Sequence, residues 1–293
     1  MNEYYFDFHL HSCLSPCGGE EMTPADLAAM CALAGYDAVA LTDHNTTGNC
    51  AAFCAAARRR GLLALPGMEL TTAEEVHVIC LFPGLDEARA FGALVRRRLP
   101  VIGNDPDVFG HQLLMDDKDA ILGEETVLLA GATDIGVYEA AGLVAQYGGV
   151  AYPAHIDRPS FSLLSNLGIW DPDMGFPLAE VSRNCPPELF DRPDLAGVRH
   201  IVGCDAHYLD QIPDSCQKMA LPELSVNEIY VSAVKKTNVN ELKELLASVA
   251  KKQEEKTIIG DLIEPNDVVV LVIPIDQSAP KGRLILPQQL VLR

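Results

Sequence analysis

The chain has 293 residues, of which 48% are hydrophobic and 22% are charged, so it is long enough to bury a sizeable core. This composition excludes a largely disordered, collagen-like or coiled-coil protein. The formal net charge of −19 argues against binding of extended nucleic acid, because no surplus of basic residues faces the phosphate backbone. No apolar run reaches the ~18 residues of a membrane span, and residues 1–5 lack signal-peptide character, so we expect a cytoplasmic protein without membrane contact.

Charge and residue usage divide the chain near residue 225. Residues 1–224 contain 13 Lys and Arg against 32 Asp and Glu, whereas residues 225–293 contain 9 of each. The first segment uses 11 Arg and 2 Lys, and the tail uses 2 Arg and 7 Lys. All nine cysteines precede residue 225, and their odd number without a C-x-x-C pair predicts reduced thiols. We therefore expect two units, residues 1–224 and 225–293.

In the first unit, β-rich apolar runs alternate with stretches rich in Ala and Leu. Pro24, which follows Thr23, begins a predicted helix over 25–33, and a second helix is expected over 49–60, ending on three arginines. The strand candidates are Tyr4–His9, Ala38–Leu41, Leu62–Leu65, Val76–Phe82, Val150–Tyr152, Leu178–Val181 and His200–Val202. Repeated strand and helix units favour an α/β fold, either a parallel barrel or an open sheet, with its site at the carboxyl ends of the strands. Residues 104–119 form an acidic insert that we expect to be a loop or a small lid.

Polar side chains gather at these strand ends. His9 and His11 lie two residues apart on an extended segment, so both imidazoles face the same side. Six of the eight histidines and two carboxylates lie at or near a strand end: His9, His11, His44, Glu69, His77, His155, Asp205 and His207. If these strand ends meet at one rim, a cluster of imidazoles and carboxylates suits zinc, manganese or iron.

Each candidate also has a simpler interpretation. A lone His77 within an apolar strand is more often a core histidine than a ligand, and Glu69 beside Gly67 fits a loop carboxylate equally well. Asp43 and Asn45 could cap the following helix, although Asp43 next to His44 is also suited to orient an imidazole. The conjunction of all these residues at successive strand ends favours the metal site.

The motifs F-D-F-H-L-H-S, L-T-D-H-N, P-G-M-E, V-H-V, P-A-H and G-C-D-A-H-Y occur in this order over residues 4–210. The series resembles that of the PHP (polymerase and histidinol phosphatase) domain. The resemblance implies a distorted (β/α)7 barrel, here with a short α+β appendage at the carboxyl end, and two or three divalent metal ions that hydrolyse phosphate esters.

By the same resemblance, each motif residue has an implied role. One metal is held by His9, His11, Glu69 and Asp205, a second by Glu69 with His77 and His155, and a third by His44 and His207. Glu69, Asp205 and His207 are then the catalytic residues. The loop after His11 lacks the ligand usual at the third site. Cys17 could replace it as a thiolate, or the third site could be weak or empty with Cys17 as a loop cysteine.

The chemistry follows from these ligands. Metal ions bridged by a carboxylate lower the pKa of a bound water from ~15.7 towards ~7 and neutralise phosphoryl oxygens, so no protein nucleophile is required. Arg158 and Arg183 follow two strand ends and are candidates to bind the substrate phosphate, because a guanidinium can donate to two oxygens. Both arginines could instead pair with acidic residues on exposed loops.

The tail resembles a different family. Residues 260–276 and 279–287 are similar to the iron–iron hydrogenase maturation GTPase (HydF), at the point where its GTPase domain ends and its next domain begins. A helix is predicted over 240–252 and a strand over 267–275. The chain has no G-x-x-x-x-G-K-[ST] motif, so no GTPase activity is inferred. A protein partner that binds through the tail is possible.

Two functions are consistent with the sequence. The first is a metal-dependent phosphoesterase that hydrolyses a small phosphorylated metabolite or nucleotide by metal-activated water. The alternative is a noncatalytic metal-binding protein associated with hydrogenase maturation, which the altered third site and the tail suggest. The sequence favours the phosphoesterase.

Overall fold

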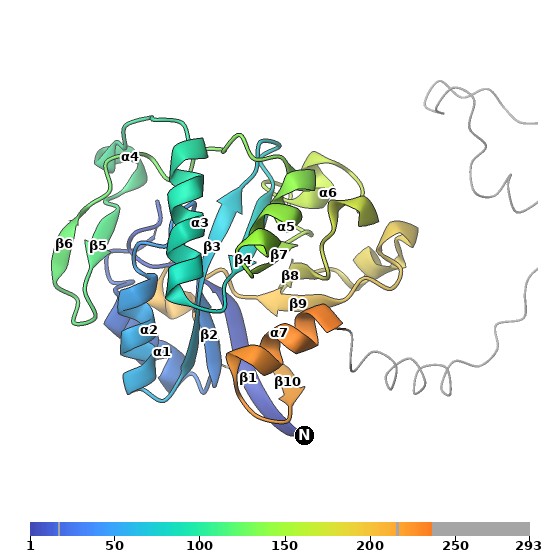
Figure 1. The fold of residues 1–293 in the computed structure, drawn as a ribbon, viewed down its shortest axis with the longest axis horizontal. Coiled ribbons are helices and arrows are strands. Elements are labelled where there is room, and N and C mark those ends of the chain that lie inside the picture. Colours follow the sequence, from blue (N-terminus) through green and yellow to red (C-terminus); the bar gives the residue numbers. More distant parts are fainter. Residues whose placement is uncertain (17, 215–216, 236–293) are drawn as a thin grey trace, which may run out of the picture. The chain divides into compact units, whose positions relative to one another are not determined.

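The structure is a computed structural model of the chain, and it describes residues 1–16, 18–214 and 217–235 (Figure 1). Cys17 and the helix and strand predicted over 240–252 and 267–275 lie outside the described residues. In the part of the chain that is described, no helix is long and apolar enough to cross a membrane.

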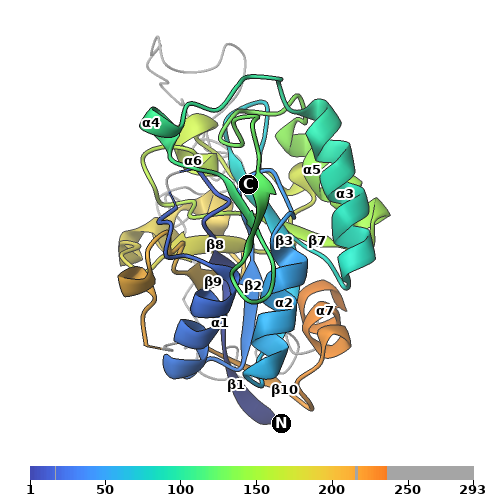
Figure 2. The ribbon, with the colours of Figure 1, turned by 90° about the vertical axis from the view of Figure 1, so that its left-hand side faces the viewer.

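Six strands form the main sheet, and two more form a separate parallel pair (Figure 2). The order in the main sheet is β10-β1-β2-β3-β4-β7, and the pair is β8-β9. The strands are β1 (Asn2–Leu10), β2 (Ala38–Leu41), β3 (Leu63–Thr71), β4 (His77–Leu81), β7 (Val150–Pro153), β8 (Ala179–Ser182), β9 (His200–Gly203) and β10 (Lys218–Leu221). All seven strands predicted from the sequence are present, although β3 runs on to Thr71.

The main sheet is mixed and not purely parallel. β1, β2 and β3 are parallel neighbours, whereas β4 pairs antiparallel with both β3 and β7. Only residues 72–76 connect β3 to β4, which is too short for the helical crossover that a parallel neighbour requires. The reversal brings His77, at the start of β4, opposite Thr71 at the end of β3. An amino-terminal strand residue thereby reaches the same rim as the carboxyl ends of β1, β2 and β3.

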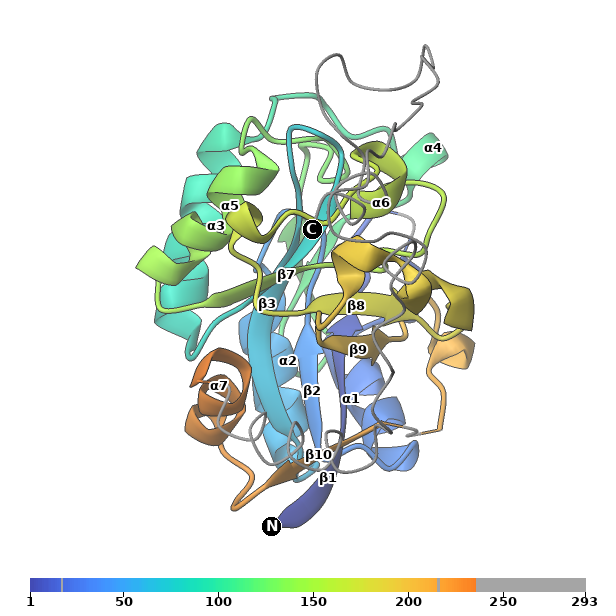
Figure 3. The ribbon, with the colours of Figure 1, turned by 90° about the vertical axis from the view of Figure 1, so that its right-hand side faces the viewer.

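The main sheet curls around a lumen, and β8 and β9 lie across it (Figure 3). β7 and β8 are joined by the bond from Ile156 N to Glu180 O (2.9 Å), without a regular ladder. On the other side, the Gln217 side chain bonds the backbone N and O of Val202 in β9 at 2.7 and 2.8 Å. The fold is therefore α/β with a half-barrel sheet, and a complete (β/α)7 barrel is not confirmed.

Helices cover the outer faces of the sheet. α1 (Pro24–Leu33) and α2 (Cys50–Arg59) pack on Leu10, Val39 and Leu41, while α3 (Leu85–Arg98) and α5 (Val137–Gln146) pack on strands β3, β4 and β7. Thr23 caps α1, as predicted, by accepting a hydrogen bond from Asp26 N at its side-chain oxygen. Along β3, Met68 and Leu70 face this outer core and Glu69 faces the lumen, which is the alternation of a strand covered on both sides.

The remaining elements are short. The acidic insert holds α4 (Pro106–Phe109) and the start of a hairpin of β5 (Leu113–Met115) and β6 (Ile121–Glu124), whose β5 end bonds Cys13 O from Leu113 N at 3.0 Å. The others are α6 (Leu163–Asn166), α7 (Val226–Lys235) and the 3-10 helices η1 (Pro172–Met174), η2 (Pro187–Asp191), η3 (Pro193–Leu195) and η4 (Leu209–Gln211). Ile229 of α7 packs with the lumen-facing residues, so the described fold includes part of the segment beyond residue 225.

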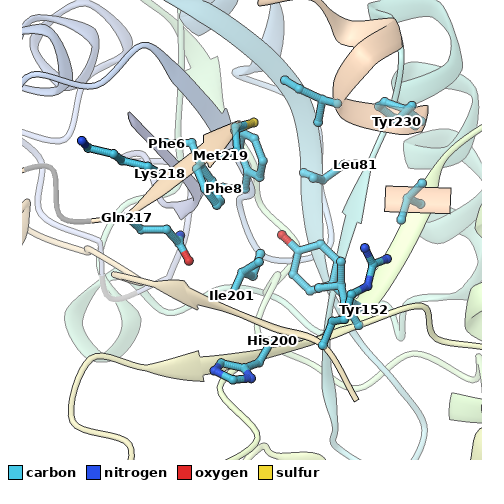
Figure 4. A pocket seen from close by; sticks show the side chains of 14 residues that line it. Phe6, Phe8, Leu81, Tyr152, His200, Ile201, Gln217, Lys218, Met219 and Tyr230 are labelled. Carbon is cyan, nitrogen blue, oxygen red and sulfur yellow. The ribbon is translucent and has the colours of Figure 1, made fainter. Parts of the chain in front are cut away.

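We call the lumen at the carboxyl ends of β1, β2 and β3 the upper lumen and its opposite end the lower lumen. The lower lumen is apolar and contains a cavity of about 280 Å³, lined among others by Phe6, Phe8, Leu81 and Ile201 (Figure 4). Tyr152 is 2% exposed, and among the described residues its hydroxyl has no hydrogen-bond partner. Figure 4 shows this hydroxyl directed into the cavity. Barrel interiors are normally filled by layers of side chains, so the hollow accompanies the incomplete closure of the sheet.

Candidate metal centre

The end of β1 supplies two buried imidazoles. His9 is in the strand and His11 is the first residue after it, and both are 0% exposed. Their Nε2 atoms lie 3.1 Å apart. Thus the H-x-H pair converges on one point in the upper lumen, as the alternation of a strand predicts.

Glu69 of β3 lies at the centre of the upper lumen. Its Oε1 atom is 3.3 Å from His9 Nε2, 2.9 Å from His77 Nδ1 and 3.2 Å from His155 Nε2. Its Oε2 atom is 3.3 Å from His11 Nε2 and 3.0 Å from His44 Nδ1. One carboxylate therefore faces five imidazoles. Burial opposes its charged form, but the rings of His77, His9, His44 and His11 hold the pKa of Glu69 well below its usual value.

Asp205 enters the centre from the turn after β9. Its Oδ1 atom is 3.1 Å from His9 Nε2 and 3.0 Å from His11 Nε2, and its Oδ2 atom contacts the Arg158 guanidinium. The ring of His207, two residues later, stacks on that of His11 with centroids 4.1 Å apart. Asp205 and His155 both have positive φ angles, 51° and 28°, so the turns that present them are strained where the site is built.

The titration of the histidines differs across the centre. Burial opposes the charged form of His11, but its contacts with Asp205 and Glu69 prevail and raise its pKa to about 9. Burial lowers the pKa of His44 to about 4 and that of His207 to about 3. His44 and His207 are therefore neutral and available as ligands at pH 7, whereas the pair from β1 binds protons in the absence of a cation.

Within the described residues, three groups of side chains are close enough to hold a cation, with ligand atoms within 4.8 Å of one another. They are His9, His11, Glu69 and Asp205; His44, Glu69 and His77; and His11, His44 and His207. The first group is the first set implied by the sequence. The other two differ from expectation. His44 takes the place expected for His155 beside Glu69 and His77, while His155 contacts Glu69 without belonging to a group, and His11 joins His44 and His207 in the third.

The donor atoms fit divalent cations. Metal–ligand bonds of ~2.0–2.2 Å place neighbouring ligand atoms ~3–3.5 Å apart, and the distances between the nitrogen and oxygen atoms given above are 3.0–3.3 Å with one exception at 2.9 Å. Several of these atoms lack a hydrogen-bond partner of adequate geometry although they are buried, including Glu69 Oε2, Asp205 Oδ1 and His44 Nδ1. Lone pairs that converge without a hydrogen between them are the arrangement that a cation satisfies.

A buried layer behind the ligands holds the histidines in place. Glu180 of β8 bonds His9 Nδ1 through Oε1 at 2.7 Å, and Ser15 Oγ bonds His11 Nδ1 at 2.9 Å and donates to Asp43 Oδ1 at 2.8 Å. Asp43 thus reaches an imidazole through Ser15, and the imidazole is that of His11. The sequence analysis missed Glu180 and Ser15. A glutamate on the inward face of an apolar strand was the signal for Glu180.

The candidate phosphate-binding residues differ in position. Arg158 borders an open recess beside the centre, together with Asp205, His207, Tyr208 and Gln211. Arg183 is exposed after β8 and does not line this recess. His111, which lies in the acidic insert, is exposed and its Nδ1 atom lies 2.9 Å from Glu124 Oε1. Cys17 lies outside the described residues.

Comparison with known families assigns the two ends of the chain. Residues 7–134 match the PHP domain family, and residues 258–293 match the hydrogen maturase F dimerization domain. The match to the PHP domain thus covers residues 7–134, less than half of the chain. Both resemblances recognised in the sequence are thereby confirmed.

Solved structures share the fold of this PHP domain at low identity. Endonuclease Q from Pyrococcus furiosus, a lesion-specific enzyme, is 16% identical with a TM-score of 0.57 over 79% of this chain and 56% of its own. The structure of Endonuclease Q with a 27-mer duplex bearing an abasic lesion is 16% identical with a TM-score of 0.56, and the match covers 80% of this chain and 57% of its own. A sulfate-bound amidohydrolase from Chromobacterium violaceum is 21% identical with a TM-score of 0.51, and the match covers 79% of this chain and 96% of its own. The present chain thus spans little more than half the length of the endonucleases. A search of curated proteins gave no match.

Proposed function

We propose that this protein is a metal-dependent phosphoesterase that acts on a small phosphorylated metabolite or nucleotide. The observation that carries the proposal is the convergence of six imidazoles and two carboxylates in the upper lumen, with ligand atoms about 3 Å apart. The PHP domain match supports a hydrolytic use of such a centre. Two or three divalent cations, zinc, manganese or iron, would be held there.

The roles of the ligands follow from their contacts. His9, His11, Glu69 and Asp205 would hold one cation, Glu69 with His77, His155 and His44 a second, and His44 and His207 with His11 a third. When bound, such cations supply a Lewis acid for the phosphoryl oxygens and acidify a water at neutral pH. Glu69 would offer a negative charge to the first and second cations and Asp205 to the first, whereas the third would have imidazole ligands alone. His207, at the open side, would move a proton. Cys17 stays a candidate ligand from the sequence alone.

Arg158 is the better placed of the two candidate phosphate-binding residues. Its side chain is 40% exposed, borders the recess and already contacts a carboxylate of the centre. A phosphate group in the recess would offer this guanidinium two oxygens, and bidentate contacts of this kind orient a phosphoryl group. Arg183 is a candidate for contact with a more distant part of the substrate.

The net charge favours a small substrate. Residues 1–224 carry the whole excess of 19 negative charges, since the tail is balanced, and DNA or RNA binding depends on basic residues that displace counterions. Endonuclease Q acts on DNA with a similar fold, so duplex DNA with an abasic lesion is the necessary competing substrate.

The test is phosphate release from a panel of small phosphoesters, with duplex DNA bearing an abasic site in parallel, in the presence of Mn²⁺ or Zn²⁺. We expect release from small phosphoesters by the wild-type protein and its loss in His9→Ala and Asp205→Ala. His111→Ala, which removes an exposed histidine outside the centre, is the matched control and should retain activity. If the protein cleaves the DNA but none of the small phosphoesters, the proposed substrate class is wrong and DNA takes its place. No hydrolysis by a fully metal-loaded protein would favour the noncatalytic metal-binding alternative.

A further inference from the structure

Glu180 is a buried carboxylate behind the centre that contacts the ring of a ligand candidate directly. It lies on β8, which contributes no ligand candidate of its own, and its side chain is 1% exposed. Oε1 lies 2.7 Å from His9 Nδ1 and accepts from the backbone N of His155 at 3.3 Å. One oxygen thus contacts two of the strand ends that build the upper lumen.

This contact decides which ring nitrogen of His9 faces the centre. An ionised carboxylate can only accept, so a hydrogen bond at 2.7 Å requires the hydrogen to be on Nδ1. In the neutral ring Nε2 then carries the lone pair, and Nε2 is the atom that faces His11, Glu69 and Asp205. The opposite tautomer would direct an N–H at the place where a cation is bound.

The neighbouring histidine shows the same arrangement by a different route. Ser15 donates its single hydroxyl hydrogen to Asp43 Oδ1, so it can only accept from His11 Nδ1 at 2.9 Å. His11 is therefore also held with Nδ1 protonated and Nε2 inward. The same tautomer is thus favoured in both rings of the H-x-H pair, by a carboxylate that contacts His9 directly and by a serine that links His11 to Asp43.

Gly203 of β9 provides the space for Glu180. A Cβ atom at this position would lie 2.4 Å from Glu180 Cδ and 2.5–2.6 Å from its two oxygens. Gly203 belongs to β9 and pairs with Ser182 of β8, so its backbone is extended and the requirement is for room. Any side chain here would displace the carboxylate from His9.

We propose that Glu180 is a positioning residue that fixes His9 in the Nδ1-protonated tautomer, so that its Nε2 lone pair is presented to a divalent cation, with Gly203 reserving the space that the carboxylate needs. The inference rests on the proposed function in that both require cations in the upper lumen. It adds a role for β8, the strand from which the sequence provides no ligand.

The test measures zinc binding and the state of the ring, without substrate. Protein stripped with a chelator is titrated with Zn²⁺ by calorimetry, and the tautomer of His9 in the zinc-loaded protein is read from ¹H–¹⁵N ring correlations, assigned by their loss in His9→Ala. We expect Nδ1–H at His9 in the wild type. Glu180→Ala should bind zinc ~10–100-fold more weakly, the range found when the partner of a ligand histidine is removed.

Variants separate positioning from folding. Glu180→Gln keeps the volume and an acceptor oxygen, so it should restore part of the affinity that Glu180→Ala loses. Gly203→Ala should weaken binding in the same direction, and Glu188→Gln, on an exposed glutamate nearby in sequence, should bind like the wild type. If circular dichroism shows that Glu180→Ala does not fold, the zinc affinity of Glu180→Gln and the ¹H–¹⁵N ring correlations of the wild-type protein test the proposal instead. An unprotonated Nδ1 at His9, or wild-type affinity in folded Glu180 variants, would overturn the proposal. Phosphate release enters neither readout, so its absence would count only against the proposed function.

Discussion

The two ends of the lumen differ in the polarity of their side chains. The upper lumen is crowded with imidazoles and carboxylates, and behind them lies a layer of Glu180, Ser15 and Asp43 that bonds their outer atoms. The lower lumen is lined mainly by aromatic and aliphatic side chains, with Arg199, His200, Gln217 and Lys218 among the residues that border it, and it retains a cavity of about 280 Å³. Strands β1, β3, β4 and β7 contribute to both ends.

The difference shows where the sequence specifies geometry closely. Converging lone pairs in the upper lumen are unfavourable without a cation, and the two rings of the H-x-H pair are each held by a buried partner, His9 by Glu180 and His11 by Ser15. Apolar contacts in the lower lumen are non-directional and tolerate an imperfect fit. Changes to the upper lumen should therefore alter binding and chemistry, and changes to the lower lumen should alter stability by small amounts.

The largest effect is expected at Glu69. Glu69→Ala removes the carboxylate that faces five imidazoles, so those rings would have no anion between them. We expect the metal content after reloading to fall by at least one ion per chain. Phosphate release should fall ~100-fold or more, because removal of a residue that only supports a ligand already costs up to ~100-fold. Metal analysis and a phosphate assay measure both. Glu188→Ala is the control, and unchanged metal content in Glu69→Ala would remove Glu69 from the centre.

A second effect is a dependence of metal binding on pH. In the metal-free protein the contacts with Asp205 and Glu69 outweigh burial and raise the pKa of His11 to about 9, so a cation must displace a proton from it. Apparent affinity for Mn²⁺ should rise between pH 6 and pH 8.5. Calorimetry in buffers of different ionisation enthalpy should show proton release. A flat affinity over this range would contradict the assignment of His11 as a ligand.

The same shift makes an opposite prediction for the metal-free fold. The pKa of His11 is higher in the folded protein than the unfolded value of 6.5, so its contribution to stability is complete below pH 6.5 and is lost as the pH rises through about 9. Chelator-treated protein should therefore unfold at lower denaturant concentration at pH 9 than at pH 6.5. Equal midpoints at the two values would show that His11 is not coupled to the carboxylates in solution.

The smallest effect is expected in the lower lumen. Val150 lines the cavity, so Val150→Ile adds a methylene group into open space and should stabilise the fold by up to about 0.8 kcal/mol. Val78, on the outer face of β4, is 0% exposed in a filled core, and Val78→Ile should destabilise by about 1–3 kcal/mol. Denaturant unfolding compares the two variants. Destabilisation by both would mean that the lower lumen is already filled in solution.

The sequence was informative where a residue pattern has one physical meaning. Seven strands were located because apolar runs bounded by turns leave few alternatives, and their polar ends were expected to meet at one rim. The direction of β4 was not foreseen, since it follows from the length of residues 72–76 and not from the strand itself. Strand β5 lies within the acidic insert that was expected to be a loop or a small lid, and its partner β6 follows that insert.

Within the centre, the sequence indicated residues that face the upper lumen and one supporting residue, Asp43, but it missed the supporting residues Glu180 and Ser15. Glu180 acts on His9 from 171 positions away, and no local spacing connects the two. Ser15 lies close to His11 in sequence, but a serine in a loop is too common to be singled out. The role of Gly203 depends on the side chain it faces across the β8-β9 pair, and such a contact requires the tertiary structure.

The most direct test of the account is an anomalous difference map from a crystal of this protein grown with Zn²⁺. The account predicts a peak bounded by His9 Nε2, His11 Nε2, Glu69 and Asp205 Oδ1, and a second peak beside Glu69 and His77. Zinc bound elsewhere, with these side chains turned apart, would contradict it.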